Sequence, residues 1–215
     1  SIIVEKVIKE KVKEELIAQG GYFLNSEESK KLANFILRSN GTMNPQIVGK
    51  SALRLAQMAG INIPCNTKVL ISEECEVSKR NPYSREKLAP ILAFYVENSW
   101  EEACERSIEI LNVEGRGHTM VIHSEDNQII REFALKKPVS RLLVNTPGAL
   151  GGIGGTTNLA PALTLGCGAV GGSSTSDNIT PLNLINIRRV AWGVRELEDI
   201  KEEKKSCEVS QDKLE

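Results

Sequence analysis

The N-terminal part of the chain alternates a short apolar run with stretches in which apolar residues recur every three or four positions. The apolar run at residues 2–4 predicts a short buried strand. Apolar residues at helical spacing then predict three helices, over residues 7–17, 26–37 and 49–58. Glycines follow each of these stretches, as expected where helices end.

From residue 68 onward, apolar strands alternate with helices. Strands are predicted over residues 68–72, 90–96, 119–123 and 141–144. One intervening helix is expected to be capped by Asn98 or Ser99, and another to run from about residue 125 to Lys136. Apolar strands separated by helices are typical of a mostly parallel sheet covered by helices on both faces. The predicted fold class is therefore α/β.

Three segments depart from this alternation. Residues 73–88 are polar and bounded by prolines, which predicts a loop with at most one helical turn. Residues 183–194 predict a late edge strand that pairs with another domain or subunit. Residues 195–215 predict a polar, disordered tail. The predicted organisation is one α/β domain over residues 1–182, the edge strand and the tail.

The chain is organised around a glycine-rich segment at residues 143–178, in which serine, threonine and asparagine fill much of the rest. Because glycine costs backbone entropy on folding, so many glycines indicate left-handed backbone, or close approach by a ligand or another main chain. A flexible linker is disfavoured, since linkers do not carry apolar residues such as Leu150, Ile153 and Leu163. We expect an ordered, mostly buried loop system.

Composition excludes several classes of protein. With 215 residues, 40% of them hydrophobic and 26% charged, the chain is an ordinary globular protein. A net charge of −1 gives no reason to expect nucleic acid or an anionic membrane as a partner. No apolar run approaches the roughly 20 residues of a membrane span, and the N-terminus lacks a signal-peptide pattern.

The five cysteines are scattered and form no C-x-x-C motif, which favours reduced thiols in the cytoplasm and argues against a metal site. Cys65 and Cys104 are interpreted as packing residues, whereas Cys75 and Cys207 lie in polar segments. Cys167 has the best local setting for a nucleophile, because flanking glycines bring backbone N–H groups near its sulfur. Even so, a small residue in a crowded loop is the favoured interpretation.

Two other residues, His118 and Glu86, are considered as candidate functional side chains. His118 stands at a Gly-x-Gly turn that enters a strand, and histidine is the residue type that exchanges a proton near neutral pH. Glu86 lies between Arg85 and Lys87 before the strand at residue 90, and spacing alone favours a solvated charge cluster there. His123 is interpreted as structural or exposed.

Four stretches, in order, resemble a known family. They are NPYSREKLAPILAFY (residues 81–95), GRGHTMVIHS (115–124), SRLLVNTPGALGG (140–152) and NLAPALTLGCGAVGGSSTSDNITPLNLINIRRVAWG (158–193). Together they resemble the C-terminal half of a CoA-acylating aldehyde dehydrogenase. The likeness is to acetaldehyde and propionaldehyde dehydrogenases of bacterial microcompartments, and to the aldehyde dehydrogenase half of bifunctional aldehyde–alcohol dehydrogenases. It covers Ser1 to about Val194.

The resemblance implies an aldehyde dehydrogenase with a Rossmann-type NAD domain and a catalytic α/β domain that presents a cysteine. In such enzymes the thiolate attacks a small aldehyde, hydride passes to NAD⁺, and CoA takes the acyl group from the enzyme thioester. The products are acyl-CoA and NADH. The resemblance also implies a homo-oligomer in the cytoplasm, with enclosure in a microcompartment and contact with its shell as an option.

Individual residues match the motifs of the family. Glu86 matches the glutamate of E-x-x-x-P, which holds the ribose hydroxyls of the nicotinamide nucleotide, and Leu88 matches the apolar residue beside the nicotinamide. His118 matches the histidine of G-x-G-H-T, a candidate acid/base. The acyl and CoA pocket would be lined by Gly151, Gly152, Thr156, Asn158 and Cys167. We expect Glu86, His118 and the glycine-rich segment to face one common cavity.

The chain departs from the family pattern in one respect. The family's nucleophilic cysteine lies in a P-C-I/V-x-E-K type motif immediately before the strand that matches residues 1–4, and this chain starts just after it. None of the five cysteines occupies that position, and the Rossmann domain is missing as well. Residues 1–182 are therefore expected to be part of a catalytic domain, and this chain alone is expected to be inactive.

Two alternative functions remain open. A non-catalytic interaction or scaffold module derived from the same fold would use residues 183–194 to add a strand to a partner. A phosphate-binding module is disfavoured, because no G-x-x-x-x-G-K-[ST] motif occurs and GALGGIGG precedes Thr156 rather than a clear helix. The sequence does not distinguish NAD from NADP or fix the length of the aldehyde.

Overall fold

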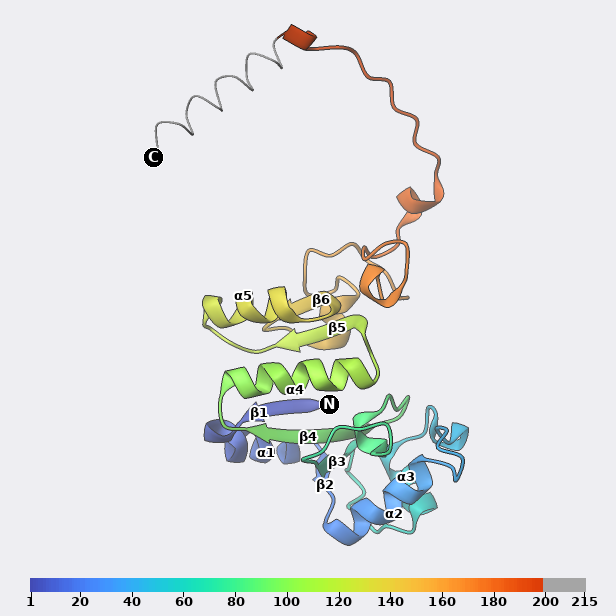
Figure 1. The fold of residues 1–215 in the computed structure, drawn as a ribbon. Helices are drawn as coiled ribbons and strands as arrows, with labels where there is room; N and C mark the ends of the chain where they lie inside the picture. The colour runs from blue at the N-terminus through green and yellow to red at the C-terminus, as the bar shows by residue number, and fades with distance from the viewer. Residues whose placement is uncertain (199–215) are drawn as a thin grey trace. The chain divides into compact units, whose positions relative to one another are not determined.

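The structure is a computed structural model that describes residues 1–198 (Figure 1). Contacts divide the chain into two units, Ser1–Thr180 and Pro181–Glu215. The first unit contains all of the strands and hydrophobic clusters found in the described residues. Most of the tail predicted for residues 195–215 lies outside the part of the chain that the structure describes.

Four parallel strands form the main sheet in the order β1-β4-β3-β2. They are β1 (Ile2–Glu5), β2 (Gly21–Phe23), β3 (Val69–Glu73) and β4 (Ile91–Glu97). The sequence predicted all of these except β2, because Gly20 and Gly21 indicated only the end of a helix. Gly20 does end the helix, with φ of 98°, but Gly21 starts a strand. A Cβ on Gly21 would lie 2.7 Å from the carbonyl oxygen of Leu16, so the two elements meet closely.

Two further strands, β5 (Gly117–Ile122) and β6 (Val139–Val144), pair in parallel, with Met120 opposite Leu142. Within the described residues they pair with each other and not with the main sheet. Both strands and their parallel direction are confirmed, but the strands form two sheets where the sequence predicted a single mostly parallel one. The reason is helix α4 (Trp100–Val113), which lies between β4 and β5 (Figure 1).

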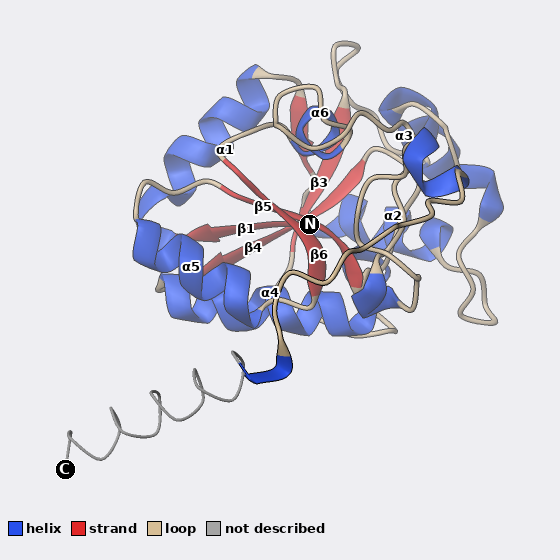
Figure 2. Ribbon diagram, turned by 90° about the horizontal axis from the view of Figure 1, so that it is seen from above, coloured by secondary structure: helices blue, strands red, loops and turns tan. Residues whose placement is uncertain are grey.

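Helices cover both faces of the main sheet, and helices surround the strands when the molecule is viewed from above (Figure 2). The helices are α1 (Lys9–Ala18), α2 (Ser26–Ile36), α3 (Ala52–Ala59) and α4. Leu32 of α2 and Leu55 of α3 pack in the cluster that contains Leu70 of β3. Leu16 of α1 packs in the cluster of Ile71, on the opposite face. Successive residues of β3 thus serve two separate cores, as alternation along a strand requires.

Helix α1 covers its face of the sheet only in part. No residue of α1 is buried, and Ile17 is 55% exposed. Val7, in the short 3-10 turn Lys6–Ile8 before it, is 86% exposed. The predicted helix is present, but part of its apolar stripe has no partner in this chain.

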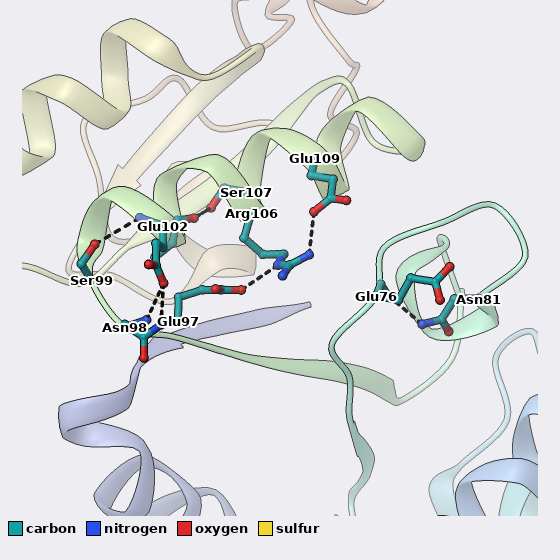
Figure 3. Close-up of polar contacts among 10 residues, drawn as sticks. Glu76, Asn81, Glu97, Asn98, Ser99, Glu102, Arg106, Ser107 and Glu109 are labelled. Carbon is teal, nitrogen blue, oxygen red and sulfur yellow. Dashed lines mark hydrogen bonds and ion pairs between the residues drawn. The ribbon is translucent and has the colours of Figure 1, made fainter.

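The helix ends follow the capping rules. Asn25 and Glu28 form a capping box at the start of α2, so the helix is capped one residue before the predicted start. Ser99 caps α4, and the Glu102 carboxylate accepts from the N–H and side-chain amide of Asn98 (Figure 3). Helix α5 (Asn127–Lys136) starts at Asp126, whose carboxylate accepts from two backbone N–H groups.

Helix α4 connects the two sheets. Ile110 packs against the main core, whereas Cys104 is buried in a third cluster with Ile122 of β5 and Phe133 of α5. Arg106 fixes α4 to the main sheet, because its guanidinium donates to Glu97 at the end of β4 (2.6 Å) and to Glu109 one turn further along α4 (2.6 Å; Figure 3).

The second unit forms no strand in its described residues. Pro181–Leu184 make a short 3-10 turn, and residues 185–196 have neither helix nor strand. The strand predicted over residues 183–194 is therefore not formed within this chain. An edge strand needs a neighbour to accept its backbone hydrogen bonds, so pairing with a second polypeptide stays a prediction.

Candidate functional site

Glu86 and Leu88 lie in the loop before β4, after the 3-10 turn Pro82–Ser84, in a segment for which the sequence predicted at most one helical turn. Both are exposed, Leu88 by 62%. Among residues 1–198 no hydrogen bond or ion pair is found for the carboxylate of Glu86. The backbone here is firmly held, because the carbonyl of Leu88 accepts from the N–H of Gly49 (2.9 Å). The side chains are therefore presented to solvent on a fixed loop.

Glu114, immediately after α4, is the residue that holds this loop. Its carboxylate accepts from Nε and Nη2 of Arg85 (both 2.8 Å) and from the backbone N–H of Glu86 (2.6 Å). Arg85 also donates to the carbonyl of Gly41 (2.6 Å). Sequence reasoning missed Glu114. A signal was available, because a carboxylate at a helix C-terminus opposes the helix dipole and therefore needs another cationic or N–H partner.

His118 enters β5 four residues after Glu114. It is exposed, and its N–H donates to the carbonyl of Gly115 in the predicted tight turn (3.2 Å). Alternation along β5 assigns His118 to the same face as Met120 and Ile122, which pack toward α4 and α5. Glu86 and His118 therefore both lie at the C-terminal end of α4. His123 is exposed at the other end of the strand.

Lys87 is a half-buried charged group beside this loop. Its ammonium donates to the carbonyls of Tyr83 (2.5 Å) and Arg85 (2.7 Å). Burial lowers the pKa of Lys87 to about 8, although the negative charges of Glu114 and Glu74 act in the opposite direction. The amino group of Ser1 lies near it, since burial and then the charge of Lys87 lower the pKa of that amino group to about 6. The amino ends of β1 and β4 thus meet at this loop.

The first part of the glycine-rich segment lies at the carboxyl end of β6. Gly151 and Gly152 are buried in the short helix α6 (Gly148–Gly152), where a Cβ on Gly151 would come within 2.7 Å of Thr146. Thr156 exchanges a hydrogen bond with the same threonine, and Asn158 is exposed. An open depression of about 400 Å³ adjoins them, lined by Ile153, Gly154, Gly155, Pro161, Ala162 and Leu163.

Cys167 lies at the opposite, amino end of the same strands. The left-handed turn at Gly117 (φ 86°) is in close contact with it, since a Cβ there would lie 2.3 Å from the Cys167 carbonyl oxygen and 2.4 Å from the N of Gly171. Its half-buried sulfur is 3.4 Å from the hydroxyl of Ser173. The length of β6 separates Cys167 from the α6 end by about 16 Å.

A buried polar connection holds the glycine-rich segment in place. Arg141 of β6 and Asn178 are 6% and 5% exposed, and Nε of Arg141 donates to the side-chain oxygen of Asn178 (2.9 Å). Arg141 also donates to the carbonyl of Gly166 (3.0 Å), and the Asn178 amide donates to the carbonyls of Gly152 (2.9 Å) and Ala160 (2.7 Å). Neither residue was predicted to matter. An arginine within an apolar strand was the available signal, because buried charge needs partners.

These positions divide the predicted site into two groups. Glu86 and His118 share the end of α4, while Gly151, Gly152 and Thr156 cover the other face of β5 and β6. The expectation of one common cavity is therefore wrong for this chain, because alternation places His118 and the glycine-rich segment on opposite faces of the small sheet. Cys167 belongs to the glycine-rich segment and lies against Gly117, the residue before His118, so it is the point at which the two groups approach each other. The chemical roles of all these residues stay predictions.

Within residues 1–198, no group of three or more His, Cys, Asp or Glu side chains is arranged to hold a metal ion. Cys65 and Cys75 are exposed, Cys104 is buried, and Cys207 lies outside the described residues. No described helix combines the length and the apolar character that a membrane span requires.

Comparison with known proteins places this architecture in a class. No family model matches the sequence. The chain is 41% identical over 196 residues to the bifunctional aldehyde-alcohol dehydrogenase AdhE of Escherichia coli K12, covering 89% of this chain and 22% of that protein. A probable aldehyde dehydrogenase of Listeria monocytogenes EGD-e is 66% identical with a TM-score of 0.86, over 93% of this chain and 44% of that one. An acetylating aldehyde dehydrogenase of Geobacillus thermoglucosidasius is 52% identical with a TM-score of 0.85, over 91% and 43%.

The parallel sheets flanked by helices are thus those of an aldehyde dehydrogenase. More narrowly, the chain belongs to the CoA-acylating aldehyde dehydrogenase family. It spans less than half the length of the solved relatives and about a fifth of the bifunctional ones.

More distant structures share the fold. A propionaldehyde dehydrogenase of Rhodopseudomonas palustris contains bound CoA and an acylated cysteine, and an engineered glycolyl-CoA reductase contains NADP⁺, both at 22% identity. A propionaldehyde dehydrogenase at 25% identity comes from the fucose utilisation microcompartment of Clostridium phytofermentans.

Proposed function

We propose that this chain is part of an oxidoreductase that converts an aldehyde, CoA and NAD⁺ into acyl-CoA and NADH through a cysteine thioester. The observation that carries the proposal is the Glu114 carboxylate, which holds the backbone of Glu86 beside the turn that presents His118. Residues from different elements are thereby fixed at one end of α4 with their reactive side chains exposed. Loops that expose polar groups on a rigid support are typical of enzyme sites.

The residues of this loop fit a nicotinamide nucleotide. The Glu86 carboxylate is exposed and has no partner among residues 1–198, so it is free to accept from two ribose hydroxyls. Leu88, two residues further on and 62% exposed, offers an apolar surface for a planar ring. When bound, the nucleotide would supply the hydride acceptor. The contribution of Glu86 and Leu88 is to orient it, and a choice between NAD and NADP does not follow from these residues.

His118 is proposed as the acid/base that moves protons during acyl transfer. Its imidazole is exposed, and the preceding residue, Gly117, is in close contact with the Cys167 segment. Gly151, Gly152, Thr156, Asn158 and Cys167 are proposed to line the approach for the acyl group and CoA. The bare backbone around Gly154 and Gly155 borders the 400 Å³ depression, which suits close contact with a large ligand.

The nucleophile is proposed to precede Ser1, because the amino end of β1 reaches the Lys87 loop and none of the four cysteines within residues 1–198 lies with both Glu86 and His118. A nearby ammonium favours a thiolate. We accordingly propose that the chain alone is inactive, and that the whole enzyme is cytoplasmic and oligomeric. Enclosure in a microcompartment, as for the fucose-utilisation relative, is the further option.

A protein extended upstream to the full length of the solved relatives tests this proposal. We expect it to form NADH from acetaldehyde only when CoA is present. Glu86→Gln should raise KM for NAD⁺ at least tenfold with little change in KM for the aldehyde, because each lost charge-assisted hydrogen bond is worth about 1.5–3 kcal/mol. CoA-independent production of the carboxylate would overturn the acylating assignment.

The alternative is a non-catalytic interaction or scaffold module. The observation that favours it is the row of exposed apolar side chains in the second unit, of which Leu184, Val190, Trp192 and Val194 are 74–89% exposed. Such exposure is unusual without a partner surface.

Light scattering tests the edge-strand prediction that both functions share. We expect a chain ending at Thr180 to fold, because the first unit retains all three hydrophobic clusters, and to self-associate less than the 215-residue chain. A monomeric full chain at concentrations of about 100 µM would rule out self-pairing through residues 183–194.

A further inference from the structure

A buried lysine and a buried cysteine meet inside the third hydrophobic cluster. Cys104 of α4 is 2% exposed, and Lys137, the residue that ends α5, is 6% exposed. Nζ of Lys137 lies 2.5 Å from Sγ of Cys104 and 4.4 Å from the centre of the Phe133 ring. Among residues 1–198 no carboxylate lies within ion-pair distance of Lys137. A buried amine normally has an acidic partner, so this pairing needs its own explanation.

The separation of the two atoms identifies the kind of contact. N–H···O hydrogen bonds span about 2.7–3.2 Å, and sulfur is a larger atom than oxygen, so 2.5 Å is too short for an N–H···S hydrogen bond. It is also too long for a direct covalent bond, since even two sulfur atoms bond at about 2.05 Å. Two atoms at this separation are spaced as if joined through one small bridging atom.

We propose that Cys104 and Lys137 form a covalent N–O–S bridge, a reversible oxidative modification of this protein. With dioxygen as the oxidant, the thiol, the amine and one O₂ give S–O–N(H) and one water. The S–H bond and one N–H bond break, an S–O and an O–N bond form, and O₂ accepts four electrons, two from sulfur and two from nitrogen. Two molecules of a dithiol return the four electrons and restore the thiol, the amine and a second water.

The surroundings suit this chemistry. The pair is enclosed by Ile122, Phe133 and their neighbours, and an apolar enclosure admits a small apolar molecule such as dioxygen more readily than a bulky thiol. The bridge would close a loop of 33 residues and fasten α4 to the end of α5. Closing such a loop restricts the unfolded chain, so the oxidised protein should melt roughly 5–10 °C higher than the reduced protein.

Mass spectrometry of the protein with its natural sequence tests the proposal directly. After exposure to air, the intact protein should be about 14 Da heavier than the same sample treated with dithiothreitol, from one oxygen gained and two hydrogens lost. Alkylation after unfolding without reductant should leave one of the five cysteines free of label, and all five should react after reduction. Trypsin should release residues 88–106 joined to residues 137–141.

Matched variants assign the two partners. Cys104→Ser and Lys137→Arg should each abolish the 14 Da gain, whereas Cys75→Ser and Lys136→Arg, which alter an exposed cysteine and an exposed lysine, should retain it. If Cys104→Ser or Lys137→Arg fails to fold, the alkylation of the natural chain still shows whether one cysteine is blocked. Labelling of all five cysteines in the unreduced protein, a product about 2 Da lighter, or an irreversible gain of about 32 Da would each overturn the proposal.

Discussion

At the residue scale, Glu86 is placed by a side chain that lies outside its own motif. The motif supplies the exposed carboxylate, but Glu114 at the end of α4 fixes the backbone that carries it. Arg85 completes the arrangement by joining the same carboxylate to the carbonyl of Gly41. The three residues between Glu114 and His118 therefore connect two motifs that are far apart in the sequence.

Lys87, half-buried behind this loop, makes stability depend on pH in a direction that can be calculated. An unfolded lysine keeps its proton up to about pH 10.5, whereas the pKa of Lys87 in the folded protein is about 8. Between these values the unfolded chain binds more protons, so the folded state gains stability as pH rises. From pH 8 to 10 the free energy of unfolding should increase by about 2 kcal/mol relative to Lys87→Met.

Urea unfolding of the natural chain and of Lys87→Met at several pH values measures this difference. The range lies above the pKa of about 6 for the Ser1 amino group, which therefore does not contribute. The two buried tyrosines, Tyr83 and Tyr95, have pKa values raised to about 12 and occur in both proteins. Lys50→Met, at an exposed site, serves as the control. A parallel pH dependence for Lys87→Met and the natural chain would show that Lys87 stays charged throughout.

At the scale of elements, the close approach of the glycine-rich segment to β5 depends on Gly117. Gly117 and Gly172 both have left-handed backbone, with φ of 86° and 93°, so alanine is strained by about 1–2 kcal/mol at either position. Only at Gly117 would the new Cβ also overlap backbone, whereas nothing lies within 4 Å of a Cβ on Gly172. Gly117→Ala should therefore cost at least about 2 kcal/mol more than Gly172→Ala.

Chemical denaturation of the two alanine variants checks this, with tryptophan fluorescence as the probe. Equal destabilisation would mean that the Cys167 segment moves away from Gly117 at no cost. In that case the placement of Cys167 beside His118 would lose its support.

Local patterns were sufficient to predict most elements, because strands such as β3 and β4 and helices such as α2 and α5 have clear periodicity and caps. Local patterns did not predict the features that depend on packing between distant segments of the chain. The separation of β5 and β6 from the main sheet results from the packing of α4, which uses Cys104 toward one cluster and Ile110 toward the other. The strand predicted over residues 183–194 is not formed in the described residues, and its pairing with a second polypeptide stays a prediction.

Only those site residues that belong to contiguous sequence motifs could be predicted. Glu86, Leu88 and His118 were found because their motifs are contiguous, and the structure leaves all three exposed. Glu114 and Asn178 were missed because each acts through contacts with segments at least 18 residues away, namely Arg85 and Glu86 for one, and Ala160, Gly152 and Arg141 for the other. Spacing in a single sequence carries no information on such contacts.

At the scale of the whole molecule, the chain has the architecture of a member of the acylating aldehyde dehydrogenase family but less than half its length. Apolar surface is exposed on both units, at Val7 and Ile17 beside α1 and at Trp192 in the second unit. Surfaces of this kind are normally buried against other domains or subunits. We therefore expect activity only from the extended protein.

The central claim is that Glu86, in the loop before β4, and His118, at the start of β5, serve one active site. A double-mutant cycle of kcat/KM in the extended protein, with Glu86→Gln, His118→Ala and the pair, measures this most directly. We predict a coupling energy above about 1 kcal/mol, as found for residues that act on the same bound molecules. Effects that add to within about 0.5 kcal/mol would contradict a shared site.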